Sequence, residues 1–154
     1  MFTLGSSTLA LGNFRLFRLK IDHNLAQIKR TRMAKIMTIE DDVLLRETLT
    51  EILEVHGHTV FQAEDGVDGV ELFSKTNPDL VLCDINMPKM DGFEVLNKIK
   101  NLVGASTFPP FIFLSAKTEP ENIKHALSLG AVDFVSKPYS APELLKLIQL
   151  RLNE

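Results

Sequence analysis

From Lys35 onward, short apolar runs alternate with longer stretches in which apolar residues recur every three or four positions. Short runs of this kind are typical of β-strands, and unbroken ones suit strands buried on both faces of a parallel sheet. The longer stretches have the period of amphipathic helices. The predicted strands cover 36–39, 58–63, 79–84, 111–114 and 132–135, and the predicted helices cover 43–56, 66–76, 93–102, 119–129 and 141–152.

Each predicted helix has an apolar stripe that we expect to face a common core. Two of the helices also begin with a capping box, Thr118–Glu121 and Ser140–Glu143, in which a hydroxyl and a glutamate three residues later bond the first backbone amides. Glycine at 57 and 130 is expected to end the first and fourth helices. The residues predicted to face inward are Leu45, Leu49, Ile52 and Leu53, then Val67, Val70 and Phe73, then Leu96 and Ile99, then Ile123, Ala126 and Leu127, then Leu144, Leu145, Ile148 and Leu152.

Five strand–helix units in succession predict an α/β fold. Strands that alternate with helices of this length form a parallel sheet with helices on both faces. Five units fit the flavodoxin-like doubly wound (βα)5 three-layer sandwich, with strand order 2-1-3-4-5. In this order the first and third strands are neighbours, and the crevice at their carboxyl ends is where such sheets bind ligands.

Polar residues follow four of the predicted strands. Glu40-Asp41 comes after the first strand, Asp84 ends the third, Ser115 follows the fourth and Lys137 follows the fifth. Because the carboxyl ends of parallel strands share one edge, we expect these side chains to converge. Three close carboxylates raise one another's pKa unless a cation lies among them, and a hard divalent ion such as Mg²⁺ prefers oxygen ligands. Glu64-Asp65 follows the second strand, at the edge of the sheet, and is predicted to be a solvated loop.

A carboxylate beside Mg²⁺, an ammonium and a hydroxyl is equipped to accept a phosphoryl group. The metal ion and Lys137 would neutralise the phosphoryl oxygens while Asp84 attacks in line. The hydroxyl of Ser115 can donate a hydrogen bond to a phosphoryl oxygen. Taken alone, Asp84 is better explained as a turn residue, and the phosphoacceptor hypothesis depends on the other three positions.

The first 34 residues differ in charge from the rest of the chain. Residues 1–34 hold six of the 17 basic residues and one of the 20 acidic ones, so the remainder carries 11 basic and 19 acidic residues. An acidic body argues against binding of nucleic acid through the main domain. We interpret 1–34 as an N-terminal extension that is disordered or not native, with Met33 as a possible true start. A basic arm and a targeting peptide are the alternatives.

Composition bounds the location of the protein. No apolar run approaches the ~20 residues needed to cross a bilayer, so no membrane partner is expected. The single cysteine, Cys83, excludes an internal disulfide and fits a reducing compartment, which predicts a cytoplasmic protein.

From Lys35 to Glu154 the chain resembles the receiver domain of two-component response regulators. The motifs that carry this resemblance are Glu40-Asp41, Asp84 followed by Met87-Pro88 and Asp91-Gly92, Ser115-Ala116 and Lys137-Pro138, each at a predicted strand end. The resemblance implies a flavodoxin-like fold and a phosphoryl group transferred to Asp84 from a phosphohistidine on a histidine kinase or phosphotransfer protein.

The resemblance also implies a role for each site residue. Asp41 and Asp84 would bind Mg²⁺ directly, Glu40 would act through a metal-bound water, and the backbone carbonyl of Asn86 would complete the protein ligands. Lys137 would pair with Asp84 and then with the phosphoryl group, and a cis peptide bond before Pro138 would aim it at the site.

Further residues would form the switch. Ser115 would move toward the phosphoryl group and the ring of Phe134 would swing inward behind it. The side chains of Asn86 and Lys117 would tune the lifetime of the acyl phosphate. Two positions depart from the commonest family pattern, since Glu40 replaces Asp and Phe134 lacks the hydroxyl of Tyr.

Three functions follow as hypotheses. The first is a single-domain response regulator, not an enzyme, that signals by a phosphorylation-dependent protein contact through the fifth strand and the two helices beside it; it rests on the end of the chain at Glu154, directly after the last helix. The alternative is a small aspartyl-phosphate phosphatase or phosphotransferase, which usually has a second Asp where this chain has Asn86. A degenerate receiver is disfavoured because no site residue is missing.

Overall fold

The computed structural model describes residues 32–116 and 118–154, and residues from Met33 to Glu154 form one compact unit. The prediction that residues 1–34 form an extension therefore lies almost entirely outside the described residues. The strands are β1 (Lys35–Ile39), β2 (Thr59–Ala63), β3 (Leu80–Asp84), β4 (Phe111–Ser115) and β5 (Asp133–Ser136). The helices are α2 (Val43–Val55), α3 (Gly66–Thr76), α4 (Gly92–Val103), α5 (Pro120–Leu129) and α6 (Ala141–Leu152).

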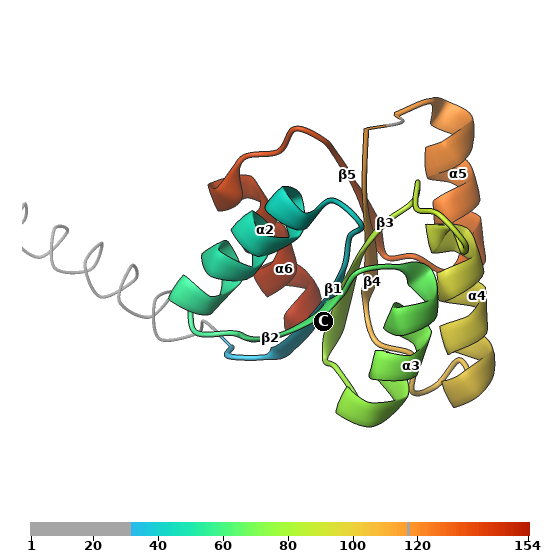
Figure 1. The fold of residues 1–154 in the computed structure, drawn as a ribbon, viewed down its shortest axis with the longest axis horizontal. Coiled ribbons are helices and arrows are strands. Elements are labelled where there is room, and N and C mark those ends of the chain that lie inside the picture. Colours follow the sequence, from blue (N-terminus) through green and yellow to red (C-terminus); the bar gives the residue numbers. More distant parts are fainter. Residues whose placement is uncertain (1–31, 117) are drawn as a thin grey trace, which may run out of the picture. The chain divides into compact units, whose positions relative to one another are not determined.

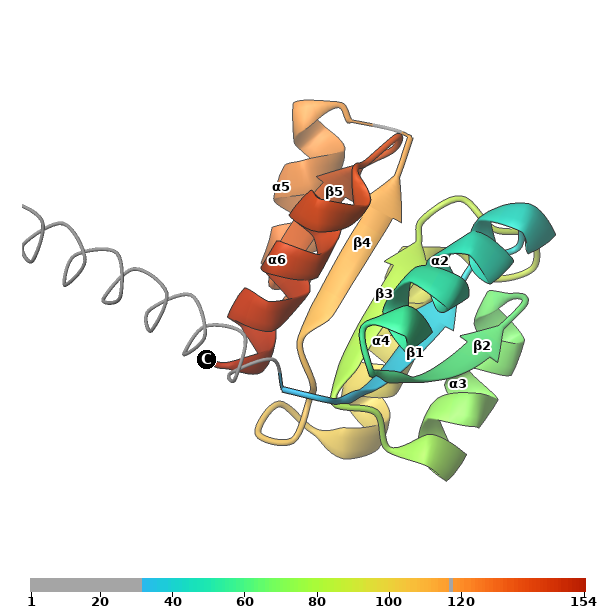
Figure 2. The ribbon, with the colours of Figure 1, turned by 90° about the vertical axis from the view of Figure 1, so that its left-hand side faces the viewer.

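All five strands are parallel and lie in the order β2-β1-β3-β4-β5, which confirms the predicted topology. Helices α2 and α6 cover one face of the sheet, and α3, α4 and α5 cover the other (Figures 1 and 2). The register pairs Ile39 with Cys83, so β1 and β3 end side by side. No helix in the described residues is long and apolar enough to cross a membrane.

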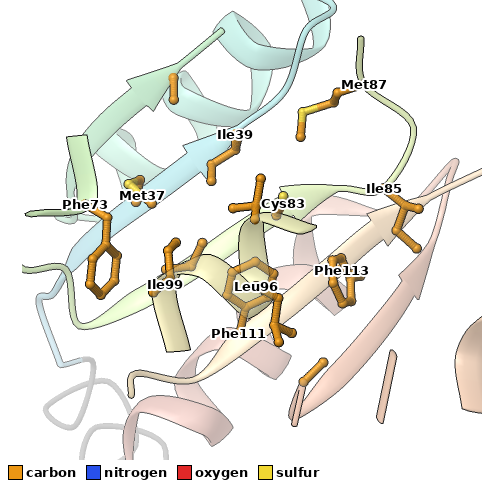
Figure 3. Close-up of a cluster of buried hydrophobic side chains, with 14 of the residues drawn as sticks. Met37, Ile39, Phe73, Cys83, Ile85, Met87, Leu96, Ile99, Phe111 and Phe113 are labelled. Atoms are coloured by element: carbon orange, nitrogen blue, oxygen red, sulfur yellow. The ribbon is translucent and has the colours of Figure 1, made fainter. Parts of the chain in front are cut away.

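The sheet is buried on both faces, as its unbroken apolar strands predict. Successive residues of a strand point to opposite faces. In β4, for example, Phe111 and Phe113 belong to the core under α3, α4 and α5 (Figure 3), while Ile112 and Leu114 belong to the core under α2 and α6. All four side chains are at most 2% exposed, and burial of each stabilises the fold by about 1.5–3 kcal/mol.

Three of the residues predicted to face the core are instead exposed: Leu45 (43%), Val67 (49%) and Leu127 (48%). Leu45 and Val67 lie in the first turn of α2 and α3, next to the strand ends, where little of the sheet remains to cover them. Leu127 follows Ala126, the buried residue of α5, and is turned about 100° away from it around the helix.

Of the two predicted capping boxes, one forms only in part and the other is wrong. At the start of α6, the backbone N–H of Glu143 donates to the hydroxyl of Ser140 as predicted, but the carboxylate of Glu143 accepts from that same hydroxyl at 2.7 Å. Helix α5 instead has Glu119 at its N-cap, without a hydrogen bond from a capping side chain, so Thr118 is not the cap. Pro120 explains the difference, because proline is favoured at the first helical position and places the cap one residue before it.

The side chain of His58 is buried where β1 and β2 begin. Its Nδ1 accepts a hydrogen bond of 3.3 Å from the backbone N–H of Ala34, which places the ring proton on Nε2. Nε2 has no hydrogen-bond partner among the described residues. Burial, and to a lesser degree the charge of His56, lowers the pKa of His58 below its usual 6.5.

We therefore expect the buried ring of His58 to contribute a loss of stability on mild acidification. The unfolded chain takes up the His58 proton first, so the contribution of the neutral ring is complete above pH 6.5 and is lost as the pH falls through the lower pKa of the folded state. One proton corresponds to at most about 1.4 kcal/mol per pH unit. Denaturant unfolding of His58→Gln between pH 7 and 5 should show a flatter dependence than the wild type. A slope in His58→Gln that is as steep as in the wild type would contradict the assignment.

Candidate functional site

The structure brings the predicted acidic residues together at the carboxyl edge of the sheet. Glu40 and Asp41 follow β1, and Asp84 ends β3 beside it. One carboxylate oxygen from each of the three residues lies within 4.8 Å of the other two. Glu40 and Asp84 are buried and Asp41 is exposed, so the cluster opens to solvent on one side.

Lys137, after β5, reaches across this edge to two of the carboxylates. Its Nζ lies 2.5 Å from Oε2 of Glu40 and 3.4 Å from Oδ2 of Asp84. The peptide bond between Lys137 and Pro138 is cis, as the resemblance implied. A single ammonium therefore bridges the ends of the first and third strands.

Burial and charge act in opposite directions on this pair. Burial raises the pKa of Glu40, and the hydrogen bond from Lys137 offsets only part of that rise. Burial alone would lower the pKa of Lys137, but its hydrogen bond to Glu40 and the charges of Asp84 and Glu40 together raise it. Lys137 is therefore held in its charged form, while the ionised form of Glu40 is destabilised by its surroundings.

Arg46 fixes the backbone that carries the acidic pair. Its Nη1 donates to the carbonyl oxygen of Glu40 at 2.6 Å and approaches that of Asp41 at 3.5 Å. Asp42 caps α2 by accepting from the N–H of Leu45 at 3.0 Å. The sequence reading missed Arg46; its position one turn into the helix that follows the acidic pair was the available signal.

The loop after Asp84 folds back tightly onto the strand end. The N–H of Gly92 donates to the carbonyl of Ile85 at 2.9 Å. A Cβ on Gly92 would lie 2.4 Å from the carbonyl oxygen of Asp84, so only glycine fits this close approach. Asn86 is exposed in this loop, and its N–H donates to Oδ1 of Asp84 at 3.4 Å.

The remaining predicted residues lie on the side of β4 and β5. Ser115 is fully buried at the end of β4, and its carbonyl accepts from the N–H of Lys137 at 2.8 Å. Phe134 is half-buried and packs against the core under α3, α4 and α5. Lys117 lies outside the described residues, so its predicted tuning role stays a prediction.

The prediction that Glu64-Asp65 is a solvated loop is wrong for Asp65. Asp65 is buried and caps α3, with Oδ1 accepting from the N–H groups of Val67 and Asp68 at 2.9 Å each. Its Oδ2 pairs with Nζ of Lys89, and this hydrogen bond is the main reason that the pKa of Asp65 is lowered. The pattern Asp65-Gly66 at a helix start was the missed signal, since aspartate is a favoured N-cap residue. Glu64 is exposed, as expected.

The donor set fits a hard divalent cation. Three carboxylates and one ammonium leave the cluster with excess negative charge when all are ionised, and the close oxygens are the ligands that Mg²⁺ prefers. The open side at Asp41 leaves room for the water ligands that Mg²⁺ keeps. The site can therefore hold a divalent cation next to Asp84.

The chain belongs to the response regulator receiver domain family, whose family model matches residues 36–149. It is 38% identical over 120 residues to transcriptional regulatory protein DltR of Streptococcus agalactiae, covering 78% of this chain and 52% of DltR. It is 36% identical over 116 residues to protein PilH of Pseudomonas aeruginosa, covering 75% of this chain and 95% of PilH. The chain thus spans about half the length of the transcriptional regulators that it matches.

Solved structures agree with this assignment. The fold matches chemotaxis protein CheY4 of Vibrio cholerae with a TM-score of 0.72 and 30% identity, over 78% of this chain and 99% of that one. It also matches a chain from the CheX–CheY complex with BeF3 and Mg²⁺ from Borrelia burgdorferi, with a TM-score of 0.70 and 28% identity, over 75% of this chain and 87% of that one. The predicted family and fold are confirmed.

We expect Mg²⁺ to stabilise the folded protein through this cluster. A cation present at ten times its Kd raises the free energy of unfolding by about 1.4 kcal/mol if it binds only the folded state. Asp41→Asn removes an exposed carboxylate of the cluster and should abolish most of this increase, measured as the shift of the thermal midpoint on adding Mg²⁺. Glu64→Gln, at the end of the neighbouring strand, is the matched control and should respond like the wild type. A full Mg²⁺ response in Asp41→Asn would contradict the site.

Proposed function

We propose that the protein is a response regulator whose Asp84 accepts a phosphoryl group from a phosphohistidine, with Mg²⁺ bound beside it. The observation that carries the proposal is the contact of Lys137 with both Glu40 and Asp84, next to the third carboxylate of Asp41. The carboxyl edge of the sheet then carries three groups that the reaction needs. They are an ammonium for the phosphoryl oxygens, an acceptor carboxylate and a cluster of oxygens that can bind a metal ion. The partner that supplies the phosphoryl group is a histidine kinase or a phosphotransfer protein.

The transfer requires one bond to form and one to break. A carboxylate oxygen of Asp84 attacks the phosphorus in line, and the bond from phosphorus to the imidazole nitrogen breaks, leaving its electron pair on the ring. Bound Mg²⁺ would supply charge neutralisation at the phosphoryl oxygens. Asp41, Asp84 and the carbonyl of Asn86 would hold it directly, and Glu40 would do so through water.

The residues around Asp84 then stabilise the product. The ammonium of Lys137 already lies beside Asp84 and would pair with a phosphoryl oxygen, and Ser115 would turn its hydroxyl toward the same group. Phe134 would move inward behind Ser115. The side chains of Asn86 and Lys117 would set how fast water reaches the acyl phosphate. This is a two-state switch driven by a local change in charge.

The signal would pass to another protein through the face formed by α5, β5 and α6. Leu127 on α5 and Leu150 on α6 are about half exposed, which supplies apolar area for a phosphorylation-dependent contact. The matched region makes up 95% of PilH and 52% of DltR, and we propose a PilH-like regulator that acts by protein contacts in the cytoplasm. The protein is then a phosphoacceptor and not an enzyme with turnover.

The phosphohistidine donor would dock at the start of α2. Val43, Leu44 and Leu45 are exposed there, with Leu44 at 71%. Beside them lies a largely apolar cavity of about 480 Å³, which reaches Lys137. The cavity is lined by Leu45, Thr48, Ile52, Ala116, Lys137, Pro138, Tyr139 and Ala141. An apolar surface next to the acceptor fits a protein donor that must bring its histidine to Asp84.

Labelling with a small phosphodonor tests the acceptor. In the presence of Mg²⁺, acetyl phosphate or phosphoramidate should introduce one phosphoryl group that is stable to acid and labile to base, as an acyl phosphate is. Asp84→Asn should abolish the label, measured by intact-protein mass spectrometry, and Asp91→Asn should retain it. Labelling that survives Asp84→Asn would refute the assignment, and turnover of a phosphomonoester would favour a phosphatase instead.

Donor docking is tested by a charge placed on the apolar surface. With a kinase or phosphotransfer protein that labels the wild type, Leu45→Asp should slow phosphoryl transfer by about tenfold or more. Loss of an apolar anchor costs an interface over 1 kcal/mol, and the added charge would also have to be desolvated. The rate with a small phosphodonor should stay near that of the wild type. Leu150→Asp, on the exposed part of α6, is the control. Equal slowing with both kinds of donor would show damage to the site and contradict the docking surface.

A further inference from the structure

Asp65 and Lys89 form an ion pair that the phosphoacceptor chemistry does not use. Nζ of Lys89 lies 2.5 Å from Oδ2 of Asp65. The side chain of Asp65 is 10% exposed and that of Lys89 is 66% exposed, so one partner is embedded in the fold and the other lies over it. The other oxygen of Asp65 accepts from two backbone amides at the start of α3, so the carboxylate cannot swing freely.

Lys89 occupies a backbone conformation that a lysine rarely takes. Its φ is 67°, in the left-handed region that favours glycine or asparagine. Lys89 is in the loop that joins Asp84 to α4, three residues after Asn86. This conformation is unfavourable for any residue with a Cβ, and the contact with Asp65 offsets part of that cost.

The same two segments also touch through their backbones. A Cβ on Gly66, the residue after Asp65, would lie 2.6 Å from the carbonyl oxygen of Met90, the residue after Lys89. The loop is closed further by hydrogen bonds from Met90 N–H to the Pro88 carbonyl and from Gly92 N–H to the Ile85 carbonyl. The start of α3 is therefore in close contact with residues 85–91, the loop between β3 and α4, which we call the acceptor loop.

We propose that the Asp65–Lys89 pair is a clamp that positions the acceptor loop, and with it the backbone of Asn86, for Mg²⁺ binding beside Asp84. The clamp holds the loop in its left-handed turn before the metal arrives, so less ordering is needed on binding. Asp65 and Lys89 are positioning residues, since neither contacts the acceptor cluster. The expected effect on Mg²⁺ binding rests on the proposed function, whereas the expected effect on the conformation of the loop does not.

Two substitutions that change the net charge in opposite directions distinguish a clamp from a long-range electrostatic effect on Mg²⁺ binding. Asp65→Asn keeps an N-cap oxygen but removes a negative charge, whereas Lys89→Met removes a positive charge. A field effect on Mg²⁺ would weaken binding in Asp65→Asn and strengthen it in Lys89→Met. A clamp predicts weaker Mg²⁺ binding in both, by about two- to fivefold, the range that a partly exposed ion pair supplies. In the double variant the loss of Mg²⁺ affinity should be no larger than in the single variant that binds Mg²⁺ more weakly, because both substitutions break the same ion pair.

Isothermal titration of the full chain with Mg²⁺ measures these affinities. The matched controls are Glu71→Gln and Lys75→Met, which break an exposed ion pair of 2.6 Å within α3 that does not touch the acceptor loop. Both should bind Mg²⁺ like the wild type. Lys89→Arg keeps the charge and the reach, and should retain most of the affinity.

Amide hydrogen exchange without metal provides a second readout. Asp65→Asn and Lys89→Met should speed exchange at Met90 and Gly92, and the two controls should not. Opposite Mg²⁺ effects in the two variants, or exchange as slow as in the wild type in both, would overturn the clamp. If the exchange result holds while Asp84→Asn still accepts the label, the clamp stands and the proposed acceptor fails.

Discussion

The ammonium of Lys137 lies between two buried carboxylates, and the arrangement of the whole strand edge depends on this contact. Glu40, Asp41 and Asp84 would repel one another at this separation, and burial of Glu40 adds the loss of its hydration. One ammonium offsets only part of that charge. The cluster therefore keeps an excess of negative charge, which a divalent cation can neutralise and a phosphoryl group on Asp84 would increase; this opposite response is the physical basis of the proposed switch.

The surroundings of the cluster differ in how firmly they are held. Helix α4 buries Val95, Leu96 and Ile99 and begins with a complete capping box at Asp91. Helix α5 buries Ala126, and the side chain of its N-cap residue makes no capping hydrogen bond. Elements with little buried apolar area open at low free energy. A change of charge at Asp84 would therefore be passed on most easily on the side of α5 and β5, where Ser115 and Phe134 lie.

The predictions that the structure contradicts have separate physical causes. Periodicity predicts the inward side of each helix, but it does not show how far the sheet extends beneath the first turn, where Leu45 and Val67 are exposed; Leu127 is exposed because it is turned away from Ala126. The capping pattern at Thr118 ignored the stronger effect of Pro120. Asp65 was treated as solvated because β2 lies at the edge of the sheet, although its real surroundings come from a loop that follows β3.

The order of apolar and polar residues determined the five strand–helix units, the parallel sheet and the strand ends at which Glu40, Asp41, Asp84 and Lys137 would meet. These features follow from local periodicity and from the rule that parallel strands share an edge, so sequence was sufficient. The tertiary structure alone decided which distant groups touch: Lys137 on Glu40 at 2.5 Å and Lys89 on Asp65. Such contacts join segments as much as 97 residues apart, and they depend on loop conformation and side-chain reach, which no local pattern records.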